Sequence, residues 1–279
     1  MERIVYYHKG CSDGFGAAWA AWKRLGSEAE YIPLKHGDEI PEYSGCQIYF
    51  LDICPSHKDL VRLESSNRVV ILDHHKTAEE IVLTCKEGVF DLNRSGAGIS
   101  WDYFCGNKKR PKLIDIVEDR DLWNWNIFGS REVLMLLDSL EKTFESWDDF
   151  ANQIECSKED DLSWGYENAI KIGASILSYQ DNLVKYASSG GFYKSIFGTN
   201  AFVVNSPILQ SFIGNFNLSD KDVDLVAIYS RKEDGFAFSL RSNKSVDCSK
   251  IAEKFGGGGH HCASGFFVKS LGEVFDDNK

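Results

Sequence analysis

The stretch Val69-Val70-Ile71-Leu72-Asp73-His74-His75-Lys76-Thr77 predicts the fold of this chain. It begins with four apolar, mostly β-branched residues, which is typical of a buried strand. The strand stops at three side chains that can each hold a metal ion, Asp73, His74 and His75. In open α/β sheets, ligands bind at the carboxyl ends of the strands. We therefore expect a functional site where this strand ends.

Two further predicted strands end in polar residues of the same kind. Residues 4–8 end in His8, with Asp13 in the loop that follows, and residues 48–52 end in Asp52. One carboxylate at a strand end is more often a turn residue. Because helical segments alternate with these strands, however, we expect a parallel sheet with all three ends at one edge. The clustered oxygen and imidazole ligands would suit Mn²⁺, Mg²⁺, Fe²⁺ or Zn²⁺.

The chain is predicted to be an α/β protein of two domains. Residues 1–165 form the first domain, a mainly parallel sheet flanked by helices. Residues 166–190 carry an apolar stripe at helical spacing and end in a Ser-Ser-Gly-Gly break, which predicts a helical connector. Residues 191–279 form a smaller α/β domain.

Composition limits the class of protein. Among 279 residues, seven Trp and eighteen Phe require a packed core. The net charge of −11 argues against scanning of duplex DNA, which depends on dense Lys and Arg. Eight cysteines without a C-x-x-C pair indicate reduced thiols. Without a signal peptide or a membrane-length apolar run, we expect a cytoplasmic protein with no membrane partner.

Two more segments are candidates for binding. Gly256-Gly257-Gly258-Gly259-His260-His261 combines a flexible backbone with paired histidines, which indicates a loop whose N–H groups bind phosphate better than it indicates a linker. Glu118-Asp119-Arg120-Asp121 follows a predicted helix. Acids around an arginine are usually a solvated surface, but here they precede an apolar Trp-Asn-Trp and are candidate ligands.

These motifs resemble the DHH phosphoesterase superfamily. Asp73-His74-His75 after a strand carries the resemblance in the first domain, together with Asp52, His8 and Asp13. The glycine run with Ala263-Ser264-Gly265, preceded by Ser239-Leu240-Arg241-Ser242, resembles the DHH-associated substrate-binding domain of nano-RNase-like oligonucleotide phosphodiesterases.

The resemblance implies an enzyme, a metal-dependent phosphoric ester hydrolase. It would hydrolyse phosphodiester bonds of very short oligonucleotides or related small nucleotides by two-metal activation of water. The implied ions are two divalent cations, Mn²⁺ first, with Mg²⁺, Co²⁺, Fe²⁺ or Zn²⁺ as alternatives. The implied metal ligands are His8, Asp13, Asp52, Asp73, His74 and Asp119, with Asp121 as the alternative to Asp119.

The resemblance also implies roles in catalysis and substrate binding. Asp52 would bridge the ions, and His75 would contact the phosphate or transfer a proton. The implied substrate contacts are Arg94, Ser95, Arg241, Ser242, Gly257, Gly258, Gly259, His260 and His261.

One position departs from the family pattern. The first loop normally carries two acids, and Cys11 stands at the earlier position if Asp13 is the second. A thiolate suits Zn²⁺ or Fe²⁺ better than Mn²⁺. Either one metal site is weaker or differently occupied, or Cys11 takes no part.

Two other functions stay open from the sequence. One is polyphosphate or pyrophosphate hydrolysis, although that branch of the family carries a different second domain. The other is a nucleotide- or phosphate-binding module that has lost catalysis. A homodimer is also left open.

Overall fold

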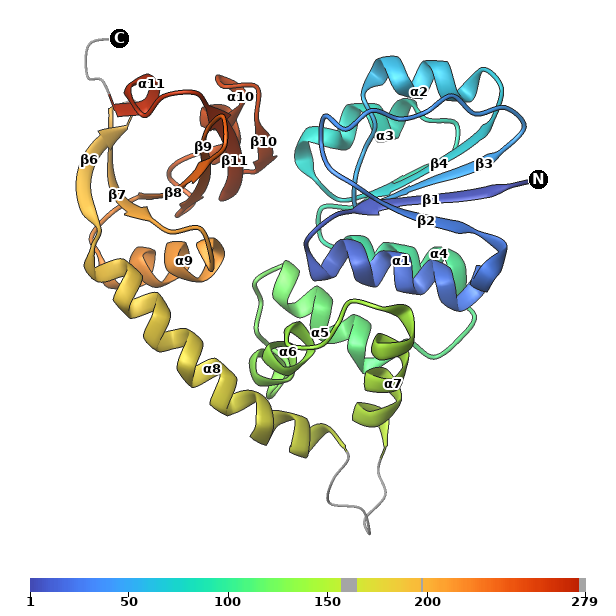
Figure 1. Ribbon diagram of the computed structural model, residues 1–279, viewed down its shortest axis with the longest axis horizontal. Helices are drawn as coiled ribbons and strands as arrows, with labels where there is room; N and C mark the ends of the chain where they lie inside the picture. Colours follow the sequence, from blue (N-terminus) through green and yellow to red (C-terminus); the bar gives the residue numbers. More distant parts are fainter. Residues whose placement is uncertain (157–164, 197, 276–279) are drawn as a thin grey trace. The chain divides into compact units, whose positions relative to one another are not determined.

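The structure is a computed structural model that describes residues 1–156, 165–196 and 198–275. The chain divides into two compact units, Met1–Leu177 and Ser178–Lys279. The boundary lies within a single long helix, α8 (Tyr166–Ser189), so both units include part of it (Figure 1).

The first unit is built on a five-stranded sheet in the order β2-β1-β3-β4-β5. Every pairing in it is parallel, which confirms the predicted α/β fold. Since β1, β3 and β4 are neighbours and parallel, their carboxyl ends meet at one edge of the sheet. The strands are β1 (Arg3–His8), β2 (Glu30–Leu34), β3 (Gln47–Leu51), β4 (Arg68–Asp73) and β5 (Gly88–Phe90).

Helices cover both faces of this sheet (Figure 1). Alternate strand residues point to opposite faces, so Val5 packs into one hydrophobic core while Ile4 and Tyr6 pack into the other. The first core lies under α1 (Ser12–Leu25) and α4 (Gly96–Cys105), and the second under α2 (His57–Glu64) and α3 (Glu79–Thr84). Two 3₁₀ turns, η1 (Gly26–Glu28) and η2 (Lys76–Ala78), complete the loops.

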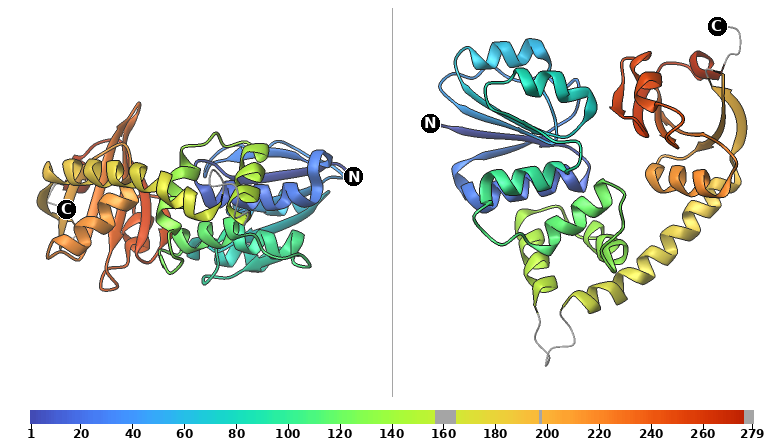
Figure 2. Two further views of the ribbon diagram at one scale, coloured as in Figure 1. Left: turned by 90° about the horizontal axis from the view of Figure 1, so that it is seen from below. Right: turned by 180° about the vertical axis from the view of Figure 1, so that it is seen from behind.

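Three further helices extend the first core beyond the sheet. They are α5 (Lys112–Asp121), α6 (Ser130–Asp138) and α7 (Phe144–Glu155), and they pack on the side of α1 and α4 (Figure 2). Trp147 of α7 is fully buried and packs edge-to-face against Phe15 of α1, with the ring centroids 4.9 Å apart. This packing fixes α5, whose last turn carries the acidic segment predicted to supply a ligand.

The second unit is a six-stranded mixed sheet in the order β10-β11-β9-β8-β7-β6. Only β7 and β8 pair in parallel. Helix α9 (Gln210–Asp220) covers one face, and α10 (Cys248–Glu253) and α11 (Gly272–Phe275) cover the other. The strands are β6 (Phe192–Ile196), β7 (Thr199–Asn205), β8 (Leu225–Lys232), β9 (Gly235–Ser242), β10 (Gly258–His260) and β11 (Ala263–Val268).

The glycine run forms more regular structure than the predicted loop. Gly258, Gly259 and His260 make strand β10, which pairs antiparallel with β11 at the edge of the sheet. Two of the glycines are needed because this segment lies close to β11: a Cβ on Gly257 would collide with the carbonyl oxygen of Gly265, and a Cβ on Gly259 with that of Ala263. We therefore correct the loop to an edge strand preceded by a turn.

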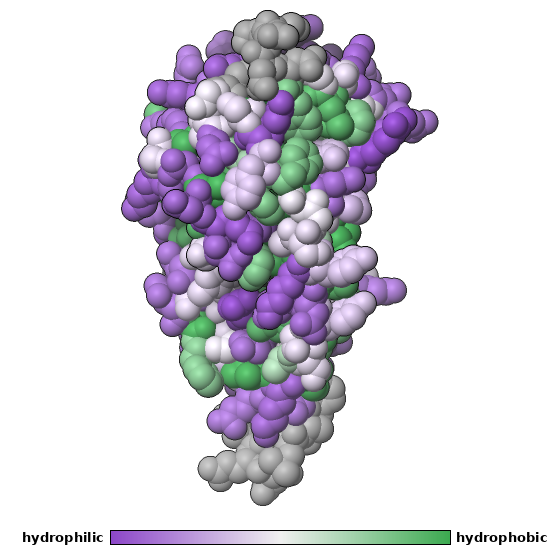
Figure 3. Space-filling model, turned by 90° about the vertical axis from the view of Figure 1, so that its left-hand side faces the viewer, coloured by the Kyte–Doolittle hydropathy of each residue, from purple (hydrophilic) through white to green (hydrophobic). Residues whose placement is uncertain are grey.

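None of the helices in the described part of the chain is both long and apolar enough to cross a bilayer. The face shown in Figure 3 mixes hydrophilic and hydrophobic residues.

Candidate metal centre

Three strand ends place the predicted ligands of the first unit. His8 ends β1, Asp52 directly follows β3 and Asp73 ends β4. Asp52 has a left-handed backbone with φ of 58°, and its N–H donates to the carbonyl oxygen of Leu72 at 2.9 Å. Such a conformation costs a non-glycine residue about 1–3 kcal/mol and occurs most often at functional sites. The strained turn directs the buried carboxylate of Asp52 into the cluster.

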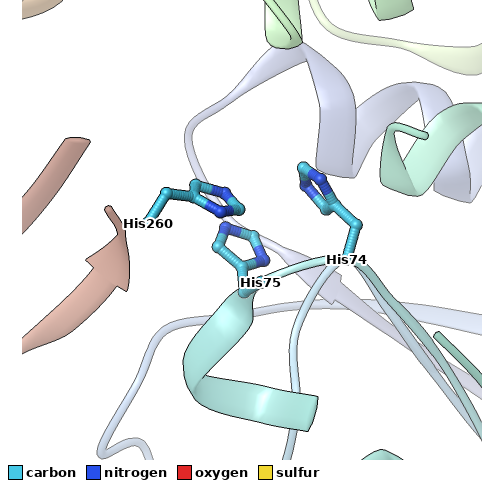
Figure 4. Close-up of side chains that lie close together, drawn as sticks. All are labelled: His74, His75 and His260. Atoms are coloured by element: carbon cyan, nitrogen blue, oxygen red, sulfur yellow. The ribbon is translucent and has the colours of Figure 1, made fainter. Parts of the chain in front are cut away.

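The carboxylate of Asp73 organises the two histidines that follow it. Its Oδ1 accepts the backbone N–H groups of His74 and His75, at 2.7 and 2.9 Å, and lies 2.8 Å from Nδ1 of His75. The imidazole rings of His74 and His75 lie next to each other, with their centroids 4.6 Å apart (Figure 4). A carboxylate that holds one ring nitrogen of a histidine fixes which nitrogen can act on a ligand.

His74 lies among three carboxylates. Its Nε2 is 3.2 Å from Asp52, 3.5 Å from Asp13 and 3.5 Å from Asp121. Burial lowers the pKa of His74, but the contact with Asp52 and the charges of Asp13 and Asp121 outweigh it and raise this pKa to about 10.

Asp13 is held by the start of helix α4. Its carboxylate accepts the N–H groups of Gly96 and Ala97 at 2.6 and 2.9 Å. Ser95 caps the same helix by accepting the N–H of Gly98. Despite these bonds, burial and the nearby charges of Asp121 and Asp52 raise the pKa of Asp13 well above its usual range.

Cys11 completes the cluster on the side of β1. Its Sγ is 3.5 Å from Nδ1 of His8 and 3.4 Å from Oδ2 of Asp52, and it accepts the N–H of Gly14 at 3.1 Å as the cap of α1. Burial and the charges of Asp52 and Asp13 raise the pKa of the Cys11 thiol well above its usual value.

The donor set fits divalent cations. Three groups in this unit bring their ligand atoms within 4.8 Å of one another: His8 with Cys11 and Asp52, Asp13 with His74 and Asp121, and Asp52 with Asp73 and His75. Oδ1 of Asp52 is buried, lies 3.2 Å from Nε2 of His74 and, among the described residues, accepts no well-aligned hydrogen bond. A dication would relieve both this buried oxygen and the repulsion between the carboxylates.

The second unit aligns candidate substrate residues across its sheet. Arg241 of β9 lies opposite Ala263 of β11, which lies opposite His260 of β10. Residues directly opposite each other point to the same face, so Arg241 and His260 share a face with a small residue between them. His260 is also drawn in Figure 4.

The Arg241 side chain is held mainly by neutral groups. Its guanidinium donates to the hydroxyls of Ser239 and Ser211 at 3.1 and 2.5 Å and to the carbonyl oxygen of Leu240 at 2.7 Å. Burial lowers its pKa. Within the described ranges, no carboxylate forms an ion pair with Arg241, so an anionic ligand would supply its missing counter-charge.

Comparison with known proteins fits this two-unit organisation. Residues 193–277 match the DHHA1 domain family. The chain belongs to the DHH phosphoesterase superfamily. A relative from Acanthamoeba polyphaga mimivirus, named uncharacterized protein R106, is 32% identical over 298 residues, covering 96% of this chain and 68% of the relative.

Two solved structures share the DHH fold. One is PggH from Vibrio cholerae, described as a pGpG-specific phosphodiesterase, with a TM-score of 0.52 and 13% identity over 96% of this chain and 94% of that one. The other is an exopolyphosphatase-related protein from Bacteroides fragilis, with a TM-score of 0.50 and 16% identity over 95% of this chain and 86% of that one.

Within this DHH fold, Asp121 and Asp119 occupy different environments. Asp121 is in the group with Asp13 and His74. The Asp119 carboxylate instead accepts the N–H groups of Asn126 and Ile127 and the hydroxyl of Ser130. Residues two apart on a helix lie about 200° apart around its axis. The geometry therefore favours Asp121 as the ligand and gives Asp119 the task of fixing the following turn.

Several predicted substrate contacts are used within the fold. The guanidinium of Arg94 pairs with Asp102 and Glu118, and Ser95 is fully buried as the cap of α4. Both side chains thus have partners within the fold, and their contact with a substrate stays a prediction. In the second unit, Ser242 donates to the carbonyl oxygen of Val246, and Nδ1 of His261 lies 3.2 Å from Asp247.

The structure also adds residues that no motif indicated. Gly96 and Ala97 directly follow the predicted substrate contact Ser95, and their N–H groups hold Asp13. The ring of His36 lies 5.8 Å from that of His8, and His36 lines a cavity of about 330 Å³. The only sequence signal for Gly96 and Ala97 was their position as two small residues after a capping serine, and no sequence pattern indicated His36.

Proposed function

We propose that this DHH-family chain hydrolyses phosphodiester bonds in very short oligonucleotides or small nucleotides, using divalent metal ions. The observation that carries the proposal is the convergence of buried carboxylates and imidazoles from three parallel strand ends on one sheet edge. Clusters of this composition bind the hard and borderline cations used in phosphoryl transfer.

The first unit would hold the ions through His8, Asp13, Asp52, Asp73, His74 and Asp121. When bound, the ions would supply a nucleophilic water and neutralise charge on the phosphate oxygens. We assign proton transfer to Nε2 of His75, because Asp73 holds its Nδ1 and so orients the ring.

The second unit would bind the nucleotide. Arg241 is a partly buried cation without an acidic ion-pair partner among the described residues, and it shares a sheet face with His260. Strand β10 lies at the sheet edge, where backbone N–H groups of the glycines could bind a phosphate. The family of this unit and the substrate named for PggH support a small nucleotide as the first substrate to test.

Polyphosphate is the second candidate substrate. It is supported by the fold shared with the exopolyphosphatase-related protein. It lacks the base and ribose of a nucleotide, so direct comparison of the two substrates separates the proposals.

The test is turnover by the purified chain after metal removal. Mn²⁺, Mg²⁺, Co²⁺ or Zn²⁺ is restored in turn, and a labelled dinucleotide, a longer single strand and polyphosphate are supplied separately. We expect the dinucleotide to be hydrolysed fastest. Turnover of polyphosphate alone would replace the proposal with the second candidate, and dinucleotide binding without turnover would indicate a lapsed enzyme.

Matched variants connect turnover to the cluster. Asp73→Asn keeps an oxygen that can accept the backbone N–H groups of His74 and His75 but removes the charge. We expect it to abolish turnover while circular dichroism stays unchanged. Arg68→Gln, at the exposed opposite end of β4, is the control and should keep its activity.

A further inference from the structure

Cys11 places a sulfur atom beside a cluster of carboxylates and imidazoles. It forms a triangle with His8 and Asp52 in which Sγ to Nδ1 is 3.5 Å, Sγ to Oδ2 is 3.4 Å and Nδ1 to Oδ2 is 3.4 Å. The N–H of Gly14 fixes the sulfur from the helix side at 3.1 Å. The three ligand atoms come from two strand ends and one helix cap, so the fold itself holds the triangle.

The size of this triangle matches one kind of ion. With zinc bonds of about 2.3 Å to sulfur, 2.0–2.1 Å to nitrogen and 2.0–2.2 Å to oxygen, a tetrahedral ion separates its ligands by about 3.4–3.6 Å. An octahedral Mg²⁺ with bonds of about 2.0–2.1 Å separates neighbouring ligands by only about 3 Å. The observed distances agree with the tetrahedral case.

A second observation concerns the carboxylate that Cys11 faces. Asp52 is buried, with Oδ2 beside Cys11 and His8 and Oδ1 3.2 Å from Nε2 of His74. Among the residues described, Oδ1 accepts no well-aligned hydrogen bond. A cation in the triangle would offset the charge of this buried carboxylate.

We propose that Cys11 is a metal ligand that makes its site selective for a thiophilic divalent ion such as Zn²⁺. Thiolate is a soft ligand and favours such ions over Mn²⁺ or Mg²⁺. The group of Asp13, His74 and Asp121 has two carboxylates and no sulfur, so it stays suited to Mn²⁺ or Mg²⁺. The two ends of one cluster therefore differ in metal preference. This inference rests on the proposed function in placing divalent ions at this sheet edge.

Two substitutions separate ligation from helix capping. Cys11 caps α1, and serine and aspartate are both good caps. Cys11→Ser keeps the cap and removes the soft ligand. Cys11→Asp keeps the cap and supplies a hard ligand. Cys156→Ser, at the end of α7, removes a partly exposed cysteine outside the cluster and serves as the matched control.

The experiment titrates Co²⁺ into the metal-stripped full chain and records absorption. We expect a near-ultraviolet thiolate-to-cobalt charge-transfer band in the wild type and in Cys156→Ser. The band should be missing in Cys11→Ser and Cys11→Asp, although the weaker visible cobalt bands remain. The preference for Zn²⁺ over Mn²⁺, measured by competition, should fall at least about tenfold in Cys11→Asp. Removing a group that merely orients a metal ligand already lowers metal affinity about 10–100-fold, so replacing the ligand itself should have at least the smaller of these effects.

The outcomes separate this inference from the proposed function. A wild type that lacks the band, or a band that persists in Cys11→Ser, overturns ligation by Cys11 even if the dinucleotide is hydrolysed. A band that depends on Cys11 supports ligation even if no dinucleotide is hydrolysed, in which case the proposed function fails alone.

Discussion

Gly96→Ala should damage the metal centre without changing any ligand. A Cβ at this position would lie 2.5 Å from Cβ and 2.8 Å from Oδ1 of Asp52, where real Cβ contacts essentially never fall below 3.0 Å. The start of α4 must then move about half an ångström away from β3. Overpacking of this kind costs about 1–3 kcal/mol of unfolding free energy.

The same movement should weaken metal binding. Gly96 and Ala97 donate the two backbone hydrogen bonds that hold Asp13. Loss of a partner that orients a ligand lowers metal affinity about 10–100-fold. Calorimetric titration of Mn²⁺ into the metal-stripped variant measures this loss, and urea denaturation measures the change in stability.

A matched control separates the clash from the general effect of replacing glycine. A Cβ on Gly190 would meet only the carbonyl oxygen of Ala187, at an ordinary 3.7 Å. Gly190→Ala should therefore bind Mn²⁺ like the wild type. If Gly96→Ala also binds Mn²⁺ with unchanged affinity and stability, the close approach of α4 to Asp52 does not shape the centre, and the reasoning is refuted.

Three further predictions follow from the same geometry. Asp121→Asn should lower the affinity for Mn²⁺ at least about tenfold. Asp119→Asn should instead lower the free energy of unfolding by about 1–3 kcal/mol and leave the affinity for Mn²⁺ nearly unchanged. The reverse pattern would identify Asp119 as the ligand. Because the pKa of His74 is raised from 6.5 to about 10 without metal, its stabilising effect on the metal-free fold should be full below pH 6.5 and lost as pH rises through about 10. Over that window the bound proton competes with metal, so apparent Mn²⁺ affinity should rise by about tenfold per pH unit for one proton, and a flat calorimetric profile would contradict this. Arg241→Ala should raise the KM for the dinucleotide about 10–100-fold, because it removes a charged hydrogen bond to the substrate. The change in kcat should be smaller, and a loss confined to kcat would contradict a binding role.

Much of the fold was predictable because it depends on local patterns. Apolar runs that end in His8, Asp52 and Asp73 mark three strands, and the alternation with helices predicts that they are parallel. Parallel neighbouring strands must end at the same edge. Helix starts depend on equally local chemistry, since Ser56 and Asp247 accept backbone N–H groups at the starts of α2 and α10.

Local sequence patterns did not predict every feature of the candidate site. Both Asp119 and Asp121 lie at the end of one helix, and sequence cannot say which side of that helix faces the sheet. Glycine permits many conformations, so the sequence alone predicts a loop for the glycine run. Its pairing with β11 shows that close contact between strands selects one of them.

By itself the sequence determined that His8, Asp52 and Asp73 lie at the ends of neighbouring strands, because strand ends follow from short-range pattern. Only the tertiary structure decided how these side chains are held. Asp13 is bonded to the amides of Gly96 and Ala97, more than 80 residues away, and Cys11 meets Asp52 across 41 positions. Contacts of this separation depend on how helices pack against the sheet, and packing is set by the shapes of many side chains together. The arrangement of ligands is therefore a property of the fold, while their identity is a property of the sequence.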